Sequence, residues 1–263
     1  MMIILAFLVI LLLMGAARGG QLVGREDWLF IGYSNTFFGS SLAHGFVNQI
    51  TKQVVSVVAH NAALPYSNTK AIFDFLQHED FINKPVQRAF YIIEAEAILS
   101  NYSNQQDTTF LTNPVEYPNS ILSEIESILA YLSTRGVDVT MCVLLTAGER
   151  STENQLELHY EEWKPLLKQA SIDYKVSFLD LTMAFDKYNE LVNIDDVDHS
   201  TLTHDGYILN DQGHTVVAHE LLSSIGIGSM QQAVDKNKWS ILKRKTTVEE
   251  IEKLRIKYEN KVL

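Results

Sequence analysis

The chain carries the stretch WLFIGYSNTFFGSSL between Trp28 and Leu42. Residues 28–32 are apolar or glycine, which is the pattern of a short strand buried on both faces. A polar Ser-Asn-Thr sequence beginning at Ser34 follows at once. In open parallel sheets, functional residues gather in the loops after the carboxyl ends of the strands. The stretch therefore predicts that Ser34 lies on a surface loop at that edge, as a candidate nucleophile.

Further along the chain, apolar runs alternate with amphipathic segments. Strands are predicted at residues 28–32, 54–59, 89–93, 137–145 and 176–181. Helices are predicted at residues 45–52, 69–77, 120–133, 156–170 and 211–222. Apolar strands that alternate with helices indicate a parallel sheet covered on both faces. We expect a three-layer α/β/α sandwich with a central parallel sheet of about five strands, of the flavodoxin-like kind.

The two ends of the chain differ from its middle. Residues 1–20 form a continuous apolar run that ends in small residues, which predicts a secretory signal peptide. A retained membrane anchor is the alternative, and it would be the only contact with a membrane. Either reading puts the rest in the secretory pathway or outside the cell, where Asn101 is a possible glycosylation acceptor. We expect one domain over residues 21–228 and a charged helical extension over 229–263.

Composition excludes several classes of function. Of the 263 residues, 46% are hydrophobic and 20% are charged, which is typical of a globular protein. The net charge of −11 disfavours nucleic acid and anionic lipid surfaces as partners. The single cysteine, Cys142, lies in an apolar run and cannot form an internal disulfide, so we expect it in the core. The sequence predicts no cofactor and no metal site.

Two motifs resemble one known family. FIGYSNT at residues 30–36 and DGYILNDQGH at residues 205–214 match the first and last blocks of the SGNH (GDSL-type) hydrolases, and the resemblance spans about residues 28–225. The family's first block is Gly-Asp-Ser, and its last is Asp-Gly-x-His-Leu-Asn-x-x-Gly-His. The resemblance implies an α/β enzyme that cleaves acyl or acetyl esters on sugars and lipids. It also implies Ser34 as the nucleophile and Asp205 as the acid that orients a histidine.

The chain departs from the family at most of the other catalytic positions. Tyr33 stands in place of the aspartate beside the nucleophile, and Ile208 in place of the catalytic histidine. Glu96 replaces the asparagine that binds the oxyanion, and Tyr66 or Ser67 replaces a glycine that donates its N–H there. Isoleucine cannot take a proton, and a carboxylate would repel the developing oxyanion. We therefore expect a catalytically impaired protein whose cleft binds an acyl-ester or glycan-like small molecule, or a protein partner.

An active enzyme stays open as the alternative. A divergent serine esterase or O-acetyltransferase would keep Ser34 and Asp205 and use a relocated base. His204 is the best candidate for that base. The alternative is that His204 is a solvated loop histidine without a catalytic role. Glu96, alone or paired with Glu94, is another candidate for acid–base work.

A second, shorter resemblance bears on the ligand. LVGREDWLF at residues 22–30 is similar to the GKDGWLF segment of the alginate-acetyltransferase-like branch of the same superfamily. Those enzymes move acetyl groups on exported polysaccharides, so the resemblance favours a carbohydrate ligand. His214, in the last block, is expected to be structural.

Overall fold

The computed structural model describes residues 25–227, apart from 79–80, 82, 96, 98–116, 146–147, 150–154, 194–196 and 198. The predictions for residues 1–20 and 229–263, for Asn101 and for Glu96 lie outside these described residues. Within them, no helix has both the length and the apolar character needed to cross a bilayer.

The centre of the molecule is a five-stranded sheet in which every pair of neighbouring strands is parallel. The strands are β1 (Glu26–Gly32), β2 (Val57–Ala63), β3 (Arg88–Glu94), β4 (Asp138–Leu144) and β5 (Ser177–Asp180), in the order β2-β1-β3-β4-β5. This confirms the predicted sheet. The second strand begins three residues later than its apolar run, because Val54 ends the preceding helix.

The helices occupy most of the connections. They are α2 (Ser34–Ser41), α3 (Phe46–Gln53), α4 (Thr69–Leu76), α7 (Tyr117–Ser133), α8 (Gln155–Asp173), α9 (Leu181–Val192) and α10 (Asp211–Ser224). All the predicted helices are present, and α2 and α9 are additional. The expectation that Ser34 lies on a surface loop is wrong, because Ser34 begins α2 and is buried.

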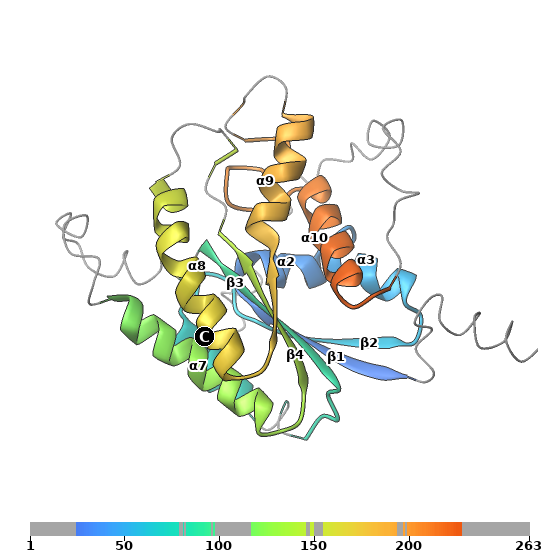
Figure 1. Cartoon of the computed structure of the whole chain (residues 1–263). Helices are drawn as coiled ribbons and strands as arrows, with labels where there is room; N and C mark the ends of the chain where they lie inside the picture. The colour runs from blue at the N-terminus through green and yellow to red at the C-terminus, as the bar shows by residue number, and fades with distance from the viewer. Residues whose placement is uncertain are drawn as a thin grey trace, which may run out of the picture.

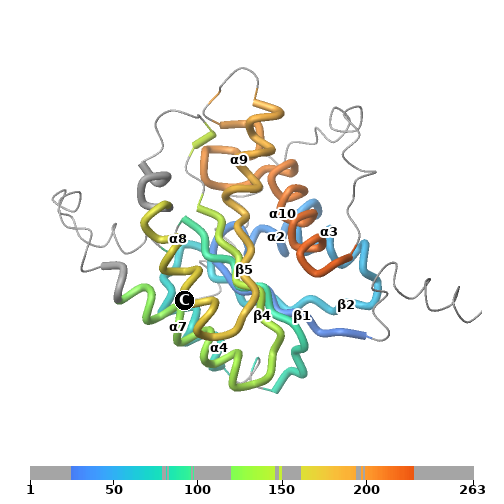
Figure 2. The backbone as a smooth tube through the Cα atoms, viewed as in Figure 1, coloured from blue at the N-terminus to red at the C-terminus, as the bar shows by residue number. Residues whose placement is uncertain are grey.

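The strands send alternate side chains to two separate cores. Leu29 and Ile31 of β1 join the core under α4, α7 and α8, whereas Trp28 and Phe30 join the core under α3, α9 and α10. The two groups of helices lie on opposite faces of the sheet (Figures 1 and 2). Alternation along each strand therefore produces the three predicted layers.

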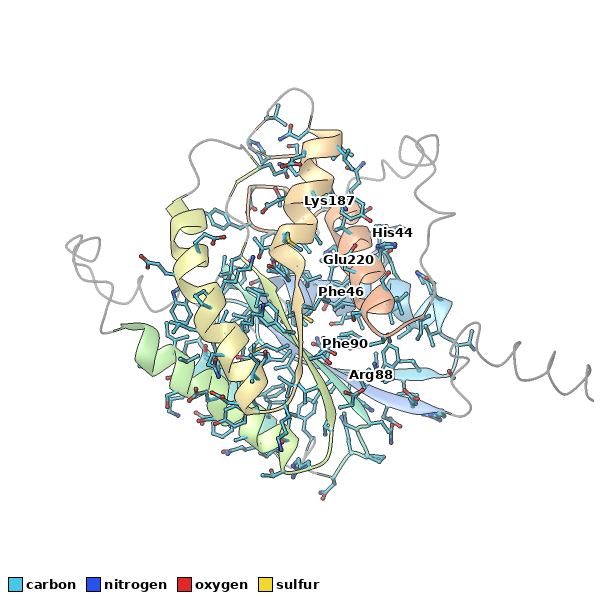
Figure 3. The ribbon with its side chains drawn as sticks, in the orientation of Figure 1. His44, Phe46, Arg88, Phe90, Lys187 and Glu220 are labelled. Carbon is cyan, nitrogen blue, oxygen red and sulfur yellow. The ribbon has the colours of Figure 1, made fainter. Side chains whose placement is uncertain are left out.

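The core under α3, α9 and α10 is rich in aromatic side chains. The rings of Phe30 and Phe90 stack with their centroids 5.5 Å apart, and Phe46 packs edge-on against Phe30. Phe46 and Phe90 lie among the side chains of this layer (Figure 3). Cys142 is fully buried in the same core, as expected from its sequence context, and burial raises the pKa of its thiol.

Candidate functional site

The candidate site lies at the carboxyl ends of β1 and β3. Ser34 follows β1 by two residues, and Glu94 is the last residue of β3. The chain order reverses at this place, because β1 has β2 on one side and β3 on the other. Ligand sites of open α/β sheets form at such switch points. The fold therefore brings Ser34 to the edge where a site is expected.

Glu94 holds the turn that carries Ser34. Its Oε1 accepts hydrogen bonds from the backbone N–H of Tyr33 at 3.0 Å and of Thr36 at 2.9 Å, and from the Thr36 hydroxyl at 2.7 Å. Its Oε2 accepts from the N–H of Asn35 at 2.7 Å. The first N–H groups of a helix lack partners within the helix, and the positive end of its dipole favours an anion. Glu94, 1% exposed, therefore caps α2 from a neighbouring strand.

Gly32 makes this close packing possible. A Cβ at position 32 would lie 2.3 Å from Oγ1 of Thr36 and 3.0 Å from Oε1 of Glu94. Any larger residue would clash first with the side chain of Thr36 and would also crowd the capping carboxylate. A glycine is thus required at position 32 chiefly by the approach of the Thr36 side chain, and secondarily by that of Glu94.

Ser34 itself is closed off from solvent. Its side chain is 0% exposed, and its Oγ accepts a hydrogen bond from the N–H of Tyr66 at 3.3 Å. Tyr66 has φ of 56°, in the left-handed region that favours glycine. Of the two residues considered for the family's glycine, Tyr66 therefore has the backbone conformation typical of glycine. Ser67 instead donates its hydroxyl to the carbonyl oxygen of Leu64 at 2.7 Å.

Tyr33 belongs to the core and not to an open pocket. Its side chain is fully buried, and its hydroxyl forms a 2.7 Å hydrogen bond with that of Thr69. Burial raises the pKa of the phenol well above its ordinary value. The residue that replaces the family's aspartate therefore contributes packing and carries no charge at this site.

The loop of the last block folds back on itself. Thr203 and Leu209 form an antiparallel bridge, and Oδ1 of the exposed Asp205 accepts from the N–H groups of Tyr207 at 2.9 Å and Ile208 at 2.8 Å. Asp205 thus stabilises its own loop, and the residue at the histidine position offers it only a backbone N–H.

Ile208, which the motif comparison predicts at the position of the catalytic histidine, packs among apolar side chains. It is 8% exposed and forms a small cluster with Phe38 and Leu42, next to Phe37. These aromatic and aliphatic partners come from α2 and the residue after it. The side chain therefore seals the loop against the helix that begins with Ser34.

Asn35 connects the turn that carries Ser34 to the loop that contains Asp205. Its side-chain amide donates to the carbonyl oxygen of Tyr207 at 3.0 Å and accepts from the N–H of Leu209 at 2.8 Å. The side chain is almost fully buried. One amide thus fixes the loop of Asp205 onto the turn of Ser34.

Replacing Asn35 with alanine is expected to lower the free energy of unfolding by about 1–3 kcal/mol, because the buried N–H of Leu209 loses its partner. Urea unfolding of the purified protein at neutral pH measures this loss. The exposed Asn83 is the matched control, and Asn83→Ala should change stability by less than about 0.5 kcal/mol. Equal stability of the two variants would contradict the bridging role of Asn35.

A second buried carboxylate, that of Glu149, holds the loop that contains Asp205. Glu149, 3% exposed, accepts from the backbone N–H groups of Thr201 at 2.9 Å, Leu202 at 2.9 Å and Thr203 at 2.6 Å, and from the Thr203 hydroxyl. Its carbonyl oxygen accepts from the side-chain amides of Asn189 and Asn193. Glu94 and Glu149 therefore play the same structural role on the two sides of the site.

His204 lies opposite Ile208 in the loop. Its backbone N–H donates to the carbonyl oxygen of Ile208 at 2.7 Å, beside the Thr203–Leu209 bridge. In the described part of the chain, Nε2 of His204 is buried and has no hydrogen-bond partner. Burial lowers the pKa of this histidine, although Asp205 and Asp211 act in the opposite direction. His204 is thus half-buried, and it is not the solvated loop histidine considered from sequence.

His214 is structural, as its position suggested. It lies inside α10 with 0% exposure, and its ring centroid is 5.8 Å from that of Phe46. Neither ring nitrogen has a hydrogen-bond partner among the described residues. Burial, and secondarily the charge of His204, lower the pKa of His214 to about 3. This histidine is therefore neutral in the folded protein at physiological pH.

Sequence reasoning missed the roles of Asn35, Glu94 and Glu149. The sequence suggests two roles for Glu94, acid–base work with Glu96 or a solvated position at the edge of the sheet, whereas Glu94 is a buried cap. One signal could have indicated this role. Glu94 directly ends a buried apolar strand, where an unpartnered carboxylate would be costly, so a set of backbone donors had to lie nearby.

Comparisons with known proteins agree with this architecture. No family model matches the sequence, and no curated protein matches it. An acetyl xylan esterase of known structure superposes with a TM-score of 0.66 at 17% identity, over 76% of this chain and 99% of that chain. An α/β hydrolase from the metagenome of Lake Arreo, Spain, superposes with a TM-score of 0.61 at 17% identity, over 80% of this chain and 99% of that chain. A GDSL-like lipase from Parabacteroides merdae, itself assigned only by similarity, gives 0.63 at 12% identity, over 78% and 97%.

At these identities the likeness concerns the fold. It agrees with the two sequence motifs at residues 30–36 and 205–214 and with the five-stranded parallel sheet. The fold of this chain is that of the SGNH, or GDSL-type, hydrolases.

Proposed function

We propose that this chain is a catalytically impaired SGNH-fold protein that acts by binding and not by hydrolysis. One observation carries the proposal: the carboxylate of Glu94 already occupies the N–H groups of Tyr33, Asn35 and Thr36 around Ser34. Ester hydrolysis needs donors that are free to receive the negative charge that develops on the substrate oxygen. Glu94 takes up the N–H groups on both sides of Ser34 and places a carboxylate at this turn, where it would repel the negative charge that develops on the substrate oxygen.

The position from which the family activates its nucleophile is apolar. A serine hydroxyl attacks an ester only when a base accepts its proton, and the residue at the histidine position is Ile208. Ser34 is 0% exposed, so an ester carbonyl has no open path to its Oγ in this conformation. Both features support loss of the chemistry with retention of the fold.

The proposed ligand is an acyl-ester or glycan-like small molecule, or a protein partner, at the edge where Ser34 lies. Two aromatic side chains support a binding role there. Tyr66, whose N–H contacts Ser34, is 52% exposed, and Tyr207, whose carbonyl oxygen contacts Asn35, is 45% exposed. Exposed tyrosines supply large contact areas at low entropic cost. The apolar residues 1–20 support secretion, or anchoring to a membrane by that segment alone.

Hydrolysis of a short-chain aryl acetate by the purified protein, run beside Ser34→Ala, tests the loss of chemistry. We expect the two progress curves to coincide with each other, because neither protein has an activated nucleophile. Loss of a single triad member already costs several orders of magnitude in rate. Turnover by the wild type well above that of Ser34→Ala would refute the proposal.

The second candidate function is a divergent serine esterase or O-acetyltransferase in which His204 replaces the missing base. The buried Nε2 of His204, which has no hydrogen-bond partner among the described residues, supports this candidate, as does the backbone bond that joins His204 to Ile208. In that case activity would vanish in His204→Ala. It would also persist below pH 6.5, because burial lowers the pKa of this histidine and keeps the base neutral. Activity unchanged by His204→Ala would remove this candidate.

A further inference from the structure

Two tyrosines place their hydroxyl groups inside the core under α4, α7 and α8. Tyr91 of β3 lies beside Ile31 of β1 in the parallel pairing, and Tyr33 follows Ile31 by two residues. Side chains two residues apart on a strand point to the same face, so both phenol rings enter this core. Both side chains are fully buried. Each hydroxyl therefore needs a hydrogen-bond partner inside the protein.

Only one of these two hydroxyl groups has such a partner. That of Tyr33 is bonded to the hydroxyl of Thr69, the first residue of α4. That of Tyr91 is buried and has no hydrogen-bond partner in the described part of the chain. Burial raises the pKa of both phenols, and each hydroxyl also acts on the other as a hydrogen-bonding neighbour. The unpartnered hydroxyl of Tyr91 therefore lies next to that of Tyr33.

The carboxyl group of Glu124, on α7, lies near the same hydroxyl groups. Its Oε2 is also buried and has no hydrogen-bond partner among the described residues. Burial raises the pKa of Glu124, whereas the backbone N–H and the ammonium group of Lys70 lower it, so the start of α4 lies against this carboxyl group. The charge of Glu124 in turn contributes to the raised pKa of Tyr33 and of Tyr91. Two unpartnered polar atoms from β3 and α7 thus lie close to one another in the core.

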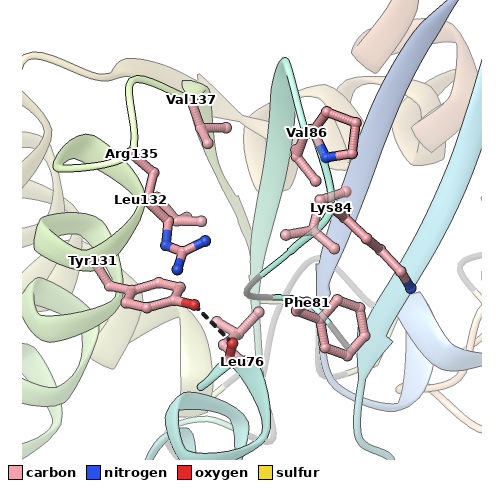
Figure 4. Close-up of a pocket in the computed structure, with 10 residues that line it drawn as sticks. Leu76, Phe81, Lys84, Val86, Tyr131, Leu132, Arg135 and Val137 are labelled. Carbon is pink, nitrogen blue, oxygen red and sulfur yellow. Dashed lines mark hydrogen bonds between the residues drawn. The ribbon is translucent and has the colours of Figure 1, made fainter. Parts of the chain in front are cut away.

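The other end of the contact between α4 and α7 has a direct hydrogen bond. The hydroxyl of Tyr131 on α7 donates to the carbonyl oxygen of Leu76, the last residue of α4, at 2.9 Å, beside a pocket that both residues line (Figure 4). This bond satisfies the tyrosine hydroxyl without any further group. At the end where Glu124 lies, the polar atoms need a further group to satisfy them.

We propose that an internal water molecule bridges Oη of Tyr91 and Oε2 of Glu124 and so ties β3 to α7. Globular proteins hold about one buried water per 27 residues, and each makes about three hydrogen bonds to polar groups that would otherwise be unsatisfied. The water accepts a hydrogen bond from Tyr91 and donates one to Oε2, so both atoms are satisfied. The hydroxyl of Tyr33 is the neighbouring third group. This binding site goes beyond the proposed function, because it lies in the core and not at the edge that would bind a ligand.

A high-resolution crystal structure of the purified protein tests the bridge directly. We expect one ordered water at about 2.7–3.0 Å from both Oη of Tyr91 and Oε2 of Glu124. The same water should be absent from crystals of Tyr91→Phe. A direct hydrogen bond from Tyr91 to Glu124 or to Tyr33, with no water between them, would overturn the proposal.

The stability of Tyr91→Phe gives a second test, in which the sign of the effect decides. If water satisfies the hydroxyl, the substitution loses one net hydrogen bond, and the folding equilibrium constant should fall about fivefold. If the hydroxyl has no partner, phenylalanine removes a buried unsatisfied group, and the variant should be more stable than the wild type. Urea unfolding measures the sign. Tyr174→Phe, at a partly buried tyrosine on the same core, is the matched control and should change the constant by about twofold or less.

A double-mutant cycle tests whether Tyr91 and Glu124 share the water. Glu124→Met keeps an unbranched stem but removes the acceptor, so Tyr91→Phe should cost nothing in that background. In a Glu126→Met background the fivefold loss should persist, because Glu126 lies two residues along α7 and on another face of the helix. An equal loss in both backgrounds would contradict the shared water.

Discussion

Glu94→Ala is expected to lower the free energy of unfolding by about 3–5 kcal/mol, a large part of the stability of an ordinary domain. The substitution removes a carboxylate that accepts four hydrogen bonds and leaves the buried N–H groups of Tyr33, Asn35 and Thr36 without their partner. Each unsatisfied buried donor costs about 1–3 kcal/mol. The start of α2 also loses the anion that complements its dipole.

Urea unfolding at neutral pH measures this loss, and Glu190→Ala, at an exposed glutamate on α9, is the matched control. The control should change stability by less than about 0.5 kcal/mol. Glu94→Gln should fall between the two, because a glutamine keeps one acceptor oxygen but turns an NH₂ group toward backbone donors. A loss under about 1 kcal/mol for Glu94→Ala would show that the cap contributes little.

The second large effect is loss of stability in acid through His214. Its pKa is about 3 in the folded protein and about 6.5 in the unfolded chain. Below pH 6.5 the unfolded chain therefore binds a proton that the folded protein does not, so stability falls as the pH falls. Each pH unit costs about 1.4 kcal/mol, so about 2–3 kcal/mol should be lost between pH 6.5 and 4.5. The loss ends near pH 3, where the folded protein also takes up the proton.

A comparison with His214→Leu isolates this contribution. Leucine fits the apolar surroundings of Phe46 and removes two unpartnered ring nitrogens, so the variant should be at least as stable as the wild type at pH 7. The difference in unfolding free energy between the two proteins should grow by about 2–3 kcal/mol from pH 6.5 to 4.5. His204 remains in both proteins, so its contribution to the pH dependence of stability largely cancels in the difference. A difference that does not change with pH would contradict the buried, neutral state of His214.

The sheet could be predicted because its signals are local. Each strand is a short apolar run, and most helices show the spacing of one buried face. The missed α9 begins at Leu181, directly after β5, so one apolar run covers both the strand and the helix start. Asp180 separates them by accepting from the N–H of Met183 at 2.8 Å, which sequence spacing does not reveal. Helix α2, which was not predicted, is capped by Glu94 of β3, and the local sequence does not reveal this contact.

The sequence motifs predict which residues lie at the candidate site, but they do not predict the contacts that these residues make. The motif comparison predicts Ile208 at the histidine position and Tyr66 or Ser67 at a glycine position. In the structure Ile208 packs against α2, and the N–H of Tyr66 donates to Ser34. The role of Glu94 depends on contacts between residues 58 to 61 positions apart, which form only when β3 pairs with β1. The carboxylate at this turn comes from Glu94, which accepts from the N–H of Tyr33.

The most direct test of the central claim is the reaction of Ser34 with a fluorophosphonate, followed by intact mass and peptide mapping. An esterase with a complete triad, treated in parallel, should gain one adduct as its serine oxygen displaces fluoride from phosphorus. We expect this protein to gain none at Ser34, because the residue is buried and no base at position 208 accepts its proton. A stoichiometric adduct on Ser34 that is absent from Ser34→Ala would contradict the account and establish an active nucleophile.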